Sequence, residues 1–488
     1  MTVISRFLRR PTASKTSVVW TLAIVSLGLF MTTLDNLVVT TALPSIRHSL
    51  GASIQSLEWT VNAYTLTFAV LLLTGAALGD RFGRRRMFAI GLSTFTAASA
   101  AAALSASTDA LIAARAVQGF GAAIVLPLTL TLLSEAVPAA RRGMALGIWG
   151  GVSGLGVAIG PLVGGAVVSG ISWHWIFWIN VPVGLVLVPL ALTRLTESRG
   201  PAPNLDLRGL ALVGPGLLGL TYGAIRGQAL GWTSATILAS FAIGIAFLIA
   251  FVAWELRAPA PMLPMRFFRS RAFAATNGLS LAMYFGVFGA IFLLAQFFQT
   301  TQGYSPLQAG LRTLPWTAMP MIVAPIAGTL SDRIGPRPLM VAGLALQAIA
   351  IAWLGAIITP DIAYGSLIAP FVLAGAGMAL VFAPSANAVL ASVRPVEAGQ
   401  ASGATNAIRE LGGVIGVAVL ASVFSANGSY ASPHAFTNGL TAAIPIGAVV
   451  LGIGALTALL VPRIRAARPE EHGHVDVRGD AAQAAVAA

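Results

Sequence analysis

Long apolar runs separated by short polar connectors make up almost the whole chain. An α-helix needs about 20 mostly apolar residues to cross a bilayer, and fourteen runs of that kind can be counted. They occupy residues 18–43, 58–79, 87–107, 109–134, 143–169, 175–194, 208–228, 233–255, 272–298, 308–330, 338–358, 364–390, 400–426 and 437–462. The pattern predicts an all-α membrane protein with fourteen transmembrane helices.

The charges in the connectors test this count, because cytoplasmic loops of membrane proteins are enriched in Arg and Lys. With the N-terminus inside, every second connector should be basic. The arginines of the predicted inner connectors are Arg81, Arg84, Arg85, Arg86, Arg141, Arg142, Arg194, Arg199, Arg257, Arg266, Arg269, Arg271, Arg333, Arg337 and Arg394. The predicted outer side offers little beyond Arg47, Arg226 and Arg312. The alternation favours fourteen spans with both termini in the cytoplasm.

Composition agrees with a membrane protein and excludes several other classes. Hydrophobic residues make up 57% of the chain and charged residues 9%, against about 25% charged residues in a typical soluble protein. The net charge of +13 lies in the connectors, so it indicates topology and no nucleic-acid partner. The chain has no cysteine, which excludes disulfides and thiolate metal sites.

The motifs of common enzymes are also missing. The one lysine, Lys15, is not part of a glycine-rich phosphate loop, and the HExxH and GxSxG motifs are absent. We therefore expect no ATP hydrolysis, no other enzymatic activity, no metal and no cofactor.

An internal repeat divides the chain. Residues 79–85 (GDRFGRR) follow the second run, and residues 331–337 (SDRIGPR) follow the tenth. Two glycine-rich stretches in the fourth and fifth runs recur at the same offset of eight runs. An offset of eight predicts two six-helix bundles with two helices inserted between them. The expected division is a cytoplasmic N-terminus (1–17), an N-terminal bundle (18–196), the inserted pair (197–258), a C-terminal bundle (259–462) and a disordered cytoplasmic tail (463–488).

The fifth run carries a glycine motif. Its members are Gly147, Gly156, Gly160, Pro161, Gly164 and Gly165. Glycines three or four residues apart form a flat helix face that a neighbouring helix can approach closely, and a proline removes a backbone donor and bends the helix. Close helix packing alone would explain this pattern equally well.

Together these motifs resemble those of the major facilitator superfamily. The spacing Gly147-x8-Gly156-x3-Gly160-Pro161-x2-Gly164-Gly165 is similar to its antiporter motif, and residues 76–85 to its cytoplasmic signature G-x-L-x-D-R-x-G-R-R. Residues 111–123 are similar to the motif of its fourth helix, and residues 34–44, 173–184 and 303–310 to motifs of its fourteen-helix drug:proton antiporter branch. Three positions depart from these patterns: Ala76 replaces a glycine, Thr40 an asparagine and His174 an arginine.

The resemblance implies a function. It implies a multidrug-efflux transporter of the cytoplasmic (inner) membrane that exchanges protons for small amphipathic compounds such as drugs, antiseptics and antibiotics. The implied mechanism is alternating access between the two bundles around a central cavity, in a monomer embedded in the lipid bilayer. Three alternatives stay open: a dedicated exporter of one endogenous metabolite or natural product, a proton-coupled importer or uniporter, and a non-transporting membrane receptor.

Asp35 is the most anomalous residue, because a carboxylate within a span costs several kcal/mol unless it faces protein or water. It lies eight residues before the predicted outer end near Leu43, which is about 12 Å at 1.5 Å per residue. Arg115 lies six residues after Asp109, or about 9 Å deep. The matched depths predict a pair that exchanges with a proton. Glu410 is a second candidate proton site. A hydrogen bond that only packs helices remains the alternative for Asp35.

Two further groups of residues complete the expected site. A gating motif at the inner helix ends would consist of Asp80, Arg81, Gly83, Arg84, Arg85, Asp332, Arg333 and Gly335. Candidates for the substrate cavity are Trp59, Tyr64, Gln118, Asn277, Gln296, Gln299 and Arg409. Anchoring at the membrane interface or hydrogen bonding between helices would explain the cavity candidates as well.

Overall fold

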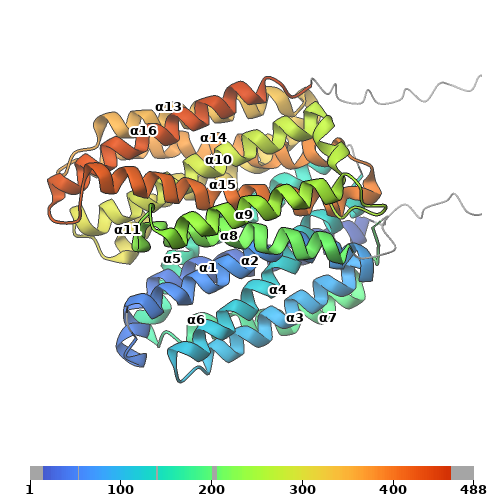
Figure 1. Cartoon of the computed structure of the whole chain (residues 1–488), viewed down its shortest axis with the longest axis horizontal. Coiled ribbons are helices and arrows are strands. Elements are labelled where there is room, and N and C mark those ends of the chain that lie inside the picture. Colours follow the sequence, from blue (N-terminus) through green and yellow to red (C-terminus); the bar gives the residue numbers. More distant parts are fainter. Residues whose placement is uncertain (1–14, 53, 139–140, 201–205, 463–488) are drawn as a thin grey trace, which may run out of the picture.

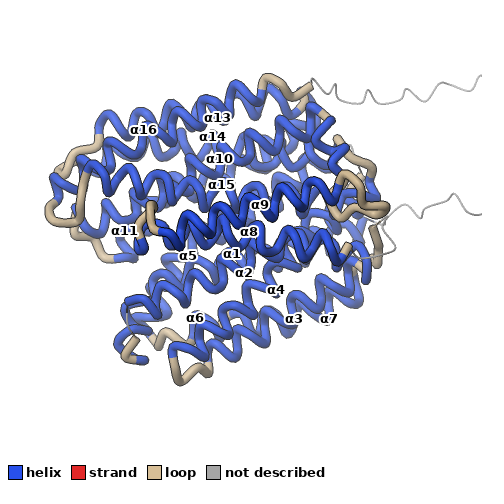
Figure 2. Tube along the Cα trace, viewed as in Figure 1, coloured by secondary structure: helices blue, strands red, loops and turns tan. Residues whose placement is uncertain are grey.

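The computed structural model describes residues 15–52, 54–138, 141–200 and 206–462. This part of the chain consists of helices and connecting loops, with no strand (Figure 2). The predicted tail 463–488 and nearly all of the predicted N-terminal segment 1–17 lie outside the described residues.

The helices follow the predicted apolar runs. The first group is α1 (Lys15–Leu50), α2 (Ile54–Phe82), α3 (Arg84–Ala103), α4 (Thr108–Ala136), α5 (Arg142–Gly170), α6 (Trp175–Trp178) and α7 (Asn180–Arg194). The inserted pair is α8 (Leu207–Leu230) and α9 (Ala235–Glu255). The last group is α10 (Arg271–Gln296), α11 (Pro306–Thr317), α12 (Met319–Ile334), α13 (Pro336–Ile357), α14 (Tyr364–Ala391), α15 (Ala398–Asn427) and α16 (Pro433–Ala458).

Local sequence explains where several helices begin. The hydroxyls of Ser107, Ser270 and Ser432 accept hydrogen bonds from the first turns of α4, α10 and α16, which satisfies backbone donors that a helix leaves free. Gly83 and Gly335 separate α2 from α3 and α12 from α13 with φ of 107° and 85°. Only glycine adopts such angles readily, so both predicted signatures place a glycine at the sharp turn.

Eleven helical segments are long and apolar enough to cross a membrane in the part of the chain described. They confirm an all-α membrane protein. The predicted runs 87–107, 143–169 and 208–228 form the helices α3, α5 and α8, which are not among these eleven. The count of fourteen crossings therefore stays a prediction.

Some predicted boundaries were wrong. The first helix continues to Leu50 rather than ending at residue 43. The predicted run 308–330 is two helices, α11 and α12, that meet at Ala318. Pro320 is the second residue of α12, in the first turn, where its missing N–H costs nothing. Pro315 removes a donor from the end of α11.

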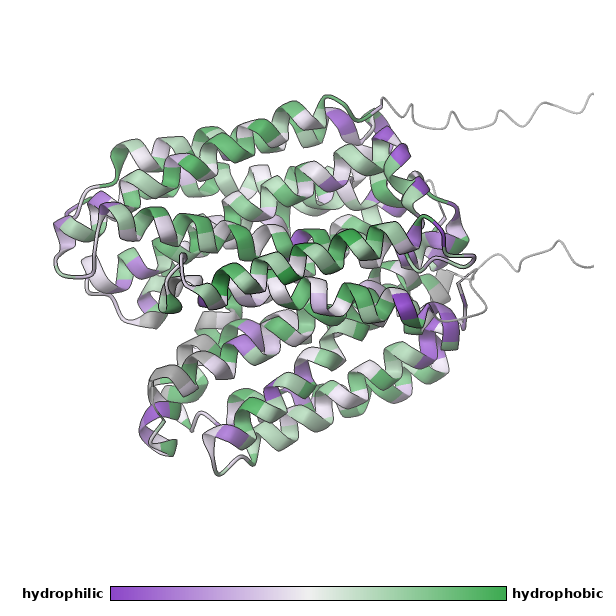
Figure 3. Cartoon of the chain, viewed as in Figure 1, coloured by the Kyte–Doolittle hydropathy of each residue, from purple (hydrophilic) through white to green (hydrophobic). Residues whose placement is uncertain are grey.

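The helices form two bundles with the inserted pair against them. Helices α1–α7 pack mainly on one another, as do α10–α16, while α8 and α9 pack together and α8 also contacts α2 and α15 (Figure 1). The start of α1 and the end of α16 lie at the same end of the molecule (Figure 1). Apolar residues dominate the middle of the helices and polar residues gather at their ends (Figure 3), as expected for a protein surrounded by a bilayer.

Candidate functional site

The structure brings Asp35 and Arg115 into direct contact. An Arg115 Nη1–H donates to Asp35 Oδ2 at 2.5 Å, and neither side chain is accessible to solvent. The matched depths in α1 and α4 had predicted this contact. An isolated charge buried in this way would be very costly, whereas a paired and hydrogen-bonded one is tolerated.

Further polar groups complete the surroundings of Asp35. Its other oxygen, Oδ1, accepts hydrogen bonds from Gln118 Nε2 at 3.2 Å and Asn180 Nδ2 at 2.7 Å. Arg115 also donates to the Thr60 carbonyl at 3.2 Å and to Gln118 Oε1 at 2.9 Å. All three donors therefore converge on the one carboxylate of Asp35. We call Asp35, Arg115, Gln118 and Asn180 the intramembrane cluster.

An aromatic wall covers Arg115. Its guanidinium lies 4.3 Å from the ring centre of Tyr64 and 5.9 Å from that of Phe177, distances at which a cation is attracted to the ring face. Tyr64 is 2% exposed, and Gln118 is fully buried. Both were candidates for the substrate cavity, and the structure places both in the cluster around the ion pair.

Sequence reasoning missed Asn180 and Ser99 as site residues. Asn180 Nδ2 donates to Asp35 and also to Ser99 Oγ at 3.0 Å, and Ser99 donates to the Phe177 carbonyl at 2.9 Å. Asn180 stands at the first position of α7, directly after the short α6. A polar residue following the aromatic stretch 173–178 was the available signal.

The second candidate proton site has a different character. Arg409 of α15 is 1% exposed. Its Nη2 donates to Ser385 Oγ at 2.9 Å, and its guanidinium lies 5.2 Å from the ring centre of Phe382. Its Nε and Nη1 have no hydrogen-bond partner. Glu410 is half-buried.

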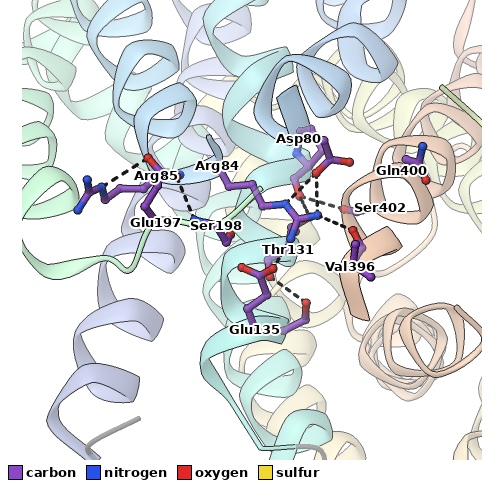
Figure 4. A network of polar contacts seen from close by, with 12 residues as sticks. Asp80, Arg84, Arg85, Thr131, Glu135, Glu197, Ser198, Val396, Gln400 and Ser402 are labelled. Carbon is purple, nitrogen blue, oxygen red and sulfur yellow. Dashed lines mark hydrogen bonds and ion pairs between the residues drawn. The ribbon is translucent and has the colours of Figure 1, made fainter. Parts of the chain in front are cut away.

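At the helix ends predicted to face the cytoplasm, Arg84 links the two bundles. Arg84 Nε donates to Asp80 Oδ1 at 2.8 Å, and Nη1 pairs with Glu135 of α4. Nη2 donates to the carbonyl of Val396 at 3.0 Å, in the turn before α15 (Figure 4). Asp80 thus pairs within its own bundle, and the contact across the interface runs through Arg84.

The rest of the first signature folds back on its own bundle. The backbone N–H of Arg85 donates to the Glu197 carboxylate at 2.9 Å (Figure 4), and that of Arg86 does so at 3.2 Å. Arg81 is exposed beside Phe82. At Gly83 a Cβ would lie 2.8 Å from Glu197 Cδ. These contacts fix the turn between α2 and α3.

The second signature contacts the other bundle directly. The Asp332 carboxylate accepts hydrogen bonds from the backbone N–H groups of Gly143 and Met144, both at 3.1 Å. These groups lie in the first turn of α5, where a helix leaves its donors free and its dipole favours a negative charge. Arg333 is exposed. Asp332 therefore caps a helix that belongs to the opposite half.

The glycines of α5 face three neighbouring helices. A Cβ at Gly147 would lie 2.5 Å from the Ala324 carbonyl oxygen of α12. At Gly156 and Gly160 a Cβ would meet Thr33 and Leu37 of α1 at 3.3 and 2.8 Å. At Gly165 it would meet Leu307 of α11 at 3.3 Å, while Gly164 is buried. The side chain of Pro161 is outside the described part of the chain.

The remaining cavity candidates lie in other places than expected. Gln299 is exposed and Gln296 half-buried, which does not fit the predicted place of both in a central cavity. They lie at the end of α10 and in the π-helical turn Phe297–Thr301 that follows it. Asn277 is buried, but its amide donates to the Phe273 carbonyl of its own helix at 2.9 Å. Trp59 lies under the guanidinium of Arg226 of α8, at 5.8 Å.

Comparison with known proteins identifies the family. The family model described as Major Facilitator Superfamily matches residues 25–417 and 276–483. The tetracenomycin C resistance and export protein of Streptomyces glaucescens is 35% identical over 402 residues, which cover 82% of this chain and 74% of that one. The cephamycin export protein of Amycolatopsis lactamdurans is 37% identical over 465 residues, or 93% of this chain and 95% of that one.

A solved structure shares the fold. The structure of the proton:xylose symporter XylE, of the same superfamily, superposes with a TM-score of 0.67 at 17% identity and covers 92% of this chain and 97% of that one. At such low identity the likeness concerns the fold alone. The chain therefore belongs to the major facilitator superfamily, as an exporter of the drug-resistance type.

Proposed function

We propose that this protein exports small amphipathic compounds in exchange for protons, by alternating access of the two bundles. The observation that carries the proposal is the intramembrane cluster, in which a buried Asp35 is held by Arg115, Gln118 and Asn180. Buried ionisable groups within a membrane are expensive and usually mark ion or substrate pathways.

The geometry supports a specific coupling step. In the present arrangement Asp35 is paired with Arg115, and in this proposal the pair corresponds to the deprotonated state. Protonation of Asp35 would remove the negative charge that attracts the Arg115 guanidinium. Arg115 would then keep only its hydrogen bonds to the Thr60 carbonyl and Gln118. Substrate binding that favours the ionised state would then release the proton. One carboxylate would thus link proton and substrate occupancy.

The arrangement at the inner helix ends supports alternating access. The Asp332 carboxylate and the Arg84 guanidinium each hold the start of a helix in the opposite half. Separation of α5 from α12 breaks the Asp332 contact, and separation of α2 from the start of α15 breaks the Arg84 contact. We propose that they act as latches that close the inner side.

The proposal includes the arrangement of the chain in the membrane. The bundles would comprise residues 18–196 and 259–462, with 197–258 inserted, and the chain would cross the cytoplasmic membrane fourteen times as a monomer. The shared end of α1 and α16 supports an even number of crossings. The arginine-rich connectors support placing both termini in the cytoplasm.

The relatives favour a second candidate, export of one natural product. They include proteins named for export of tetracenomycin C, cephamycin and, as a probable transporter, actinorhodin. Another relative is named a multidrug resistance protein. A panel of chemically unrelated compounds separates the two candidates, since a dedicated exporter would move one structural class.

The proposal is tested with inside-out vesicles. Accumulation of a fluorescent cationic dye is measured with an imposed pH gradient, acidic inside, and after the gradient is collapsed. The exporter is expected to accumulate dye only with the gradient. Equal uptake of every compound tested, with and without the gradient, would refute proton coupling.

A further inference from the structure

An apolar cavity lies between the inserted helices and the α2–α15 contact. Its volume is about 370 Å³, within the range of roughly 300–1,000 Å³ of small-molecule pockets. Leu73 of α2, Leu217 of α8, Phe251 of α9 and Ala407 of α15 line it, together with Met265 and Phe268 from the connector to α10. The cavity therefore joins both bundles and the inserted pair.

The lining favours a hydrocarbon chain over a drug. All thirteen described lining residues are Leu, Val, Ile, Phe, Met or Ala. Pockets for drug-sized ligands place a few polar groups among apolar ones to fix orientation, and this lining has none. An acyl chain needs no such partner.

The mouth of the cavity faces the bilayer. Val252 and Phe268 belong to the lining and remain 43% and 38% exposed. On the same helix as Val252, Ile245 and Ile249 are 51% and 65% exposed, as expected of a face in contact with lipid. Figure 1 shows α8 and α9 on the near surface of the molecule. A lipid chain can thus reach the cavity from the membrane.

Positive charge surrounds the same end of the cavity. The short helix Met265–Arg269 carries two lining residues, Met265 and Phe268, and two exposed arginines, Arg266 and Arg269. Arg257 and Arg271 flank it and are also exposed. Three carboxylates lie nearby: Glu397 pairs with Arg266 and Arg394, Glu255 accepts from the Leu263 N–H and Asp206 from the Trp254 indole. Counted with Arg394, five arginines face these three carboxylates, so a positive surplus remains. Basic groups beside membrane helices recognise anionic lipid head groups.

We propose that this cavity binds one anionic phospholipid, with an acyl chain among the apolar side chains and its phosphate on the arginines of residues 257–271. Because α2, α15, α8 and α9 all contribute to the site, the bound lipid stabilises the arrangement in which they are together. The site is independent of the proton-coupling cluster.

The test uses the purified full-length protein and native mass spectrometry. Dioleoyl phosphatidylglycerol and dioleoyl phosphatidylcholine are titrated separately. The wild type is expected to bind one phosphatidylglycerol in preference to phosphatidylcholine. Val252→Trp narrows the mouth and should lower the affinity for both lipids about tenfold or more, because roughly two methylene groups would no longer be buried. Ile249→Trp on the same helix is the matched control and retains wild-type binding.

Charge is tested separately. Arg269→Gln should lower the affinity for phosphatidylglycerol by about fivefold and leave the affinity for phosphatidylcholine unchanged. Arg141→Gln, at an exposed arginine before α5, leaves both unchanged. Leu411→Phe fills the cavity from α15 and replaces Val252→Trp in the test if Val252→Trp unfolds early in a thermal melt. The same loss of lipid binding is expected from it.

Two results would overturn the lipid site. Equal binding by the Val252→Trp and Ile249→Trp variants would show that the cavity holds no chain. The second result is that a transported dye displaces the lipid and that Val252→Trp lowers the affinity for both dye and lipid. This would assign the cavity to the transport route.

Discussion

Two of the contacts between the bundles are built from related motifs but differ in construction. We call the contact of α5 with α12 the first seam and that of α2 with α15 the second seam. Each begins with an aspartate against a glycine: Asp332 at Gly143 and Asp80 at Gly399. In the first seam Asp332 bonds to the helix backbone, whereas in the second Arg84 makes that connection.

The seams diverge further along the helices. In the first, backbone faces backbone: a Cβ at Gly328 would lie 2.1 Å from the Gly143 carbonyl oxygen. At the related place in the second, Ala76 replaces the motif's glycine, and Gly403 faces its Cβ. Beyond this point α8 packs against both α2 and α15. The inserted helices thus cover the seam that has fewer glycines.

The largest effect is expected from Gly328→Ala in the first seam. The new methyl would meet backbone atoms that cannot rotate away, so α5 and α12 must separate at a cost of about 1–3 kcal/mol. The thermal unfolding midpoint of the purified protein should fall and transport should be lost. Gly151→Ala is the control, since its nearest atom would be 3.4 Å away. Equal shifts in both variants would contradict this account of the seam.

A smaller and reversible effect is expected from Gly403→Ala in the second seam. Its Cβ would lie 2.6 Å from the Cβ of Ala76. The obstacle is one methyl group, so adding Ala76→Gly should restore the unfolding midpoint and dye transport. If the double variant is no better than Gly403→Ala alone, the two positions do not share one contact.

The smallest effect is expected from Asp332→Asn. It removes the negative charge at the start of α5 but keeps an oxygen acceptor, at a cost of about 0.3–1 kcal/mol. The chain has no cysteine, so cysteines introduced at chosen positions can be spin-labelled selectively. Labels at positions 144 and 334 report the first seam, and labels at positions 82 and 396 report the second. The distance across the first seam should shift toward longer values while the second stays unchanged. A shift of both seams together would mean that they open only as a unit.

Sequence patterns were sufficient for some parts of this picture. Helix type and approximate position followed from the apolar runs, and the Asp35–Arg115 contact followed from depth. The glycines of α5 predicted close packing, but not that Gly147 faces α12 while Gly160 faces α1. That division depends on how the bundles meet, which no local pattern encodes. Gln299 was misplaced because the π-helical turn rotates the end of α10, and Asn180 was missed because an asparagine near a helix start is common.

The central claim is that Asp35 carries the coupled proton, and substrate-induced proton release tests it most directly. A transported compound is added to the purified protein in weakly buffered detergent solution that contains a pH-sensitive dye. The wild type and Glu410→Gln are expected to release protons equally, whereas Asp35→Asn releases none although it still binds the compound. Release from Asp35→Asn at the wild-type level, or its loss only in Glu410→Gln, would contradict the claim.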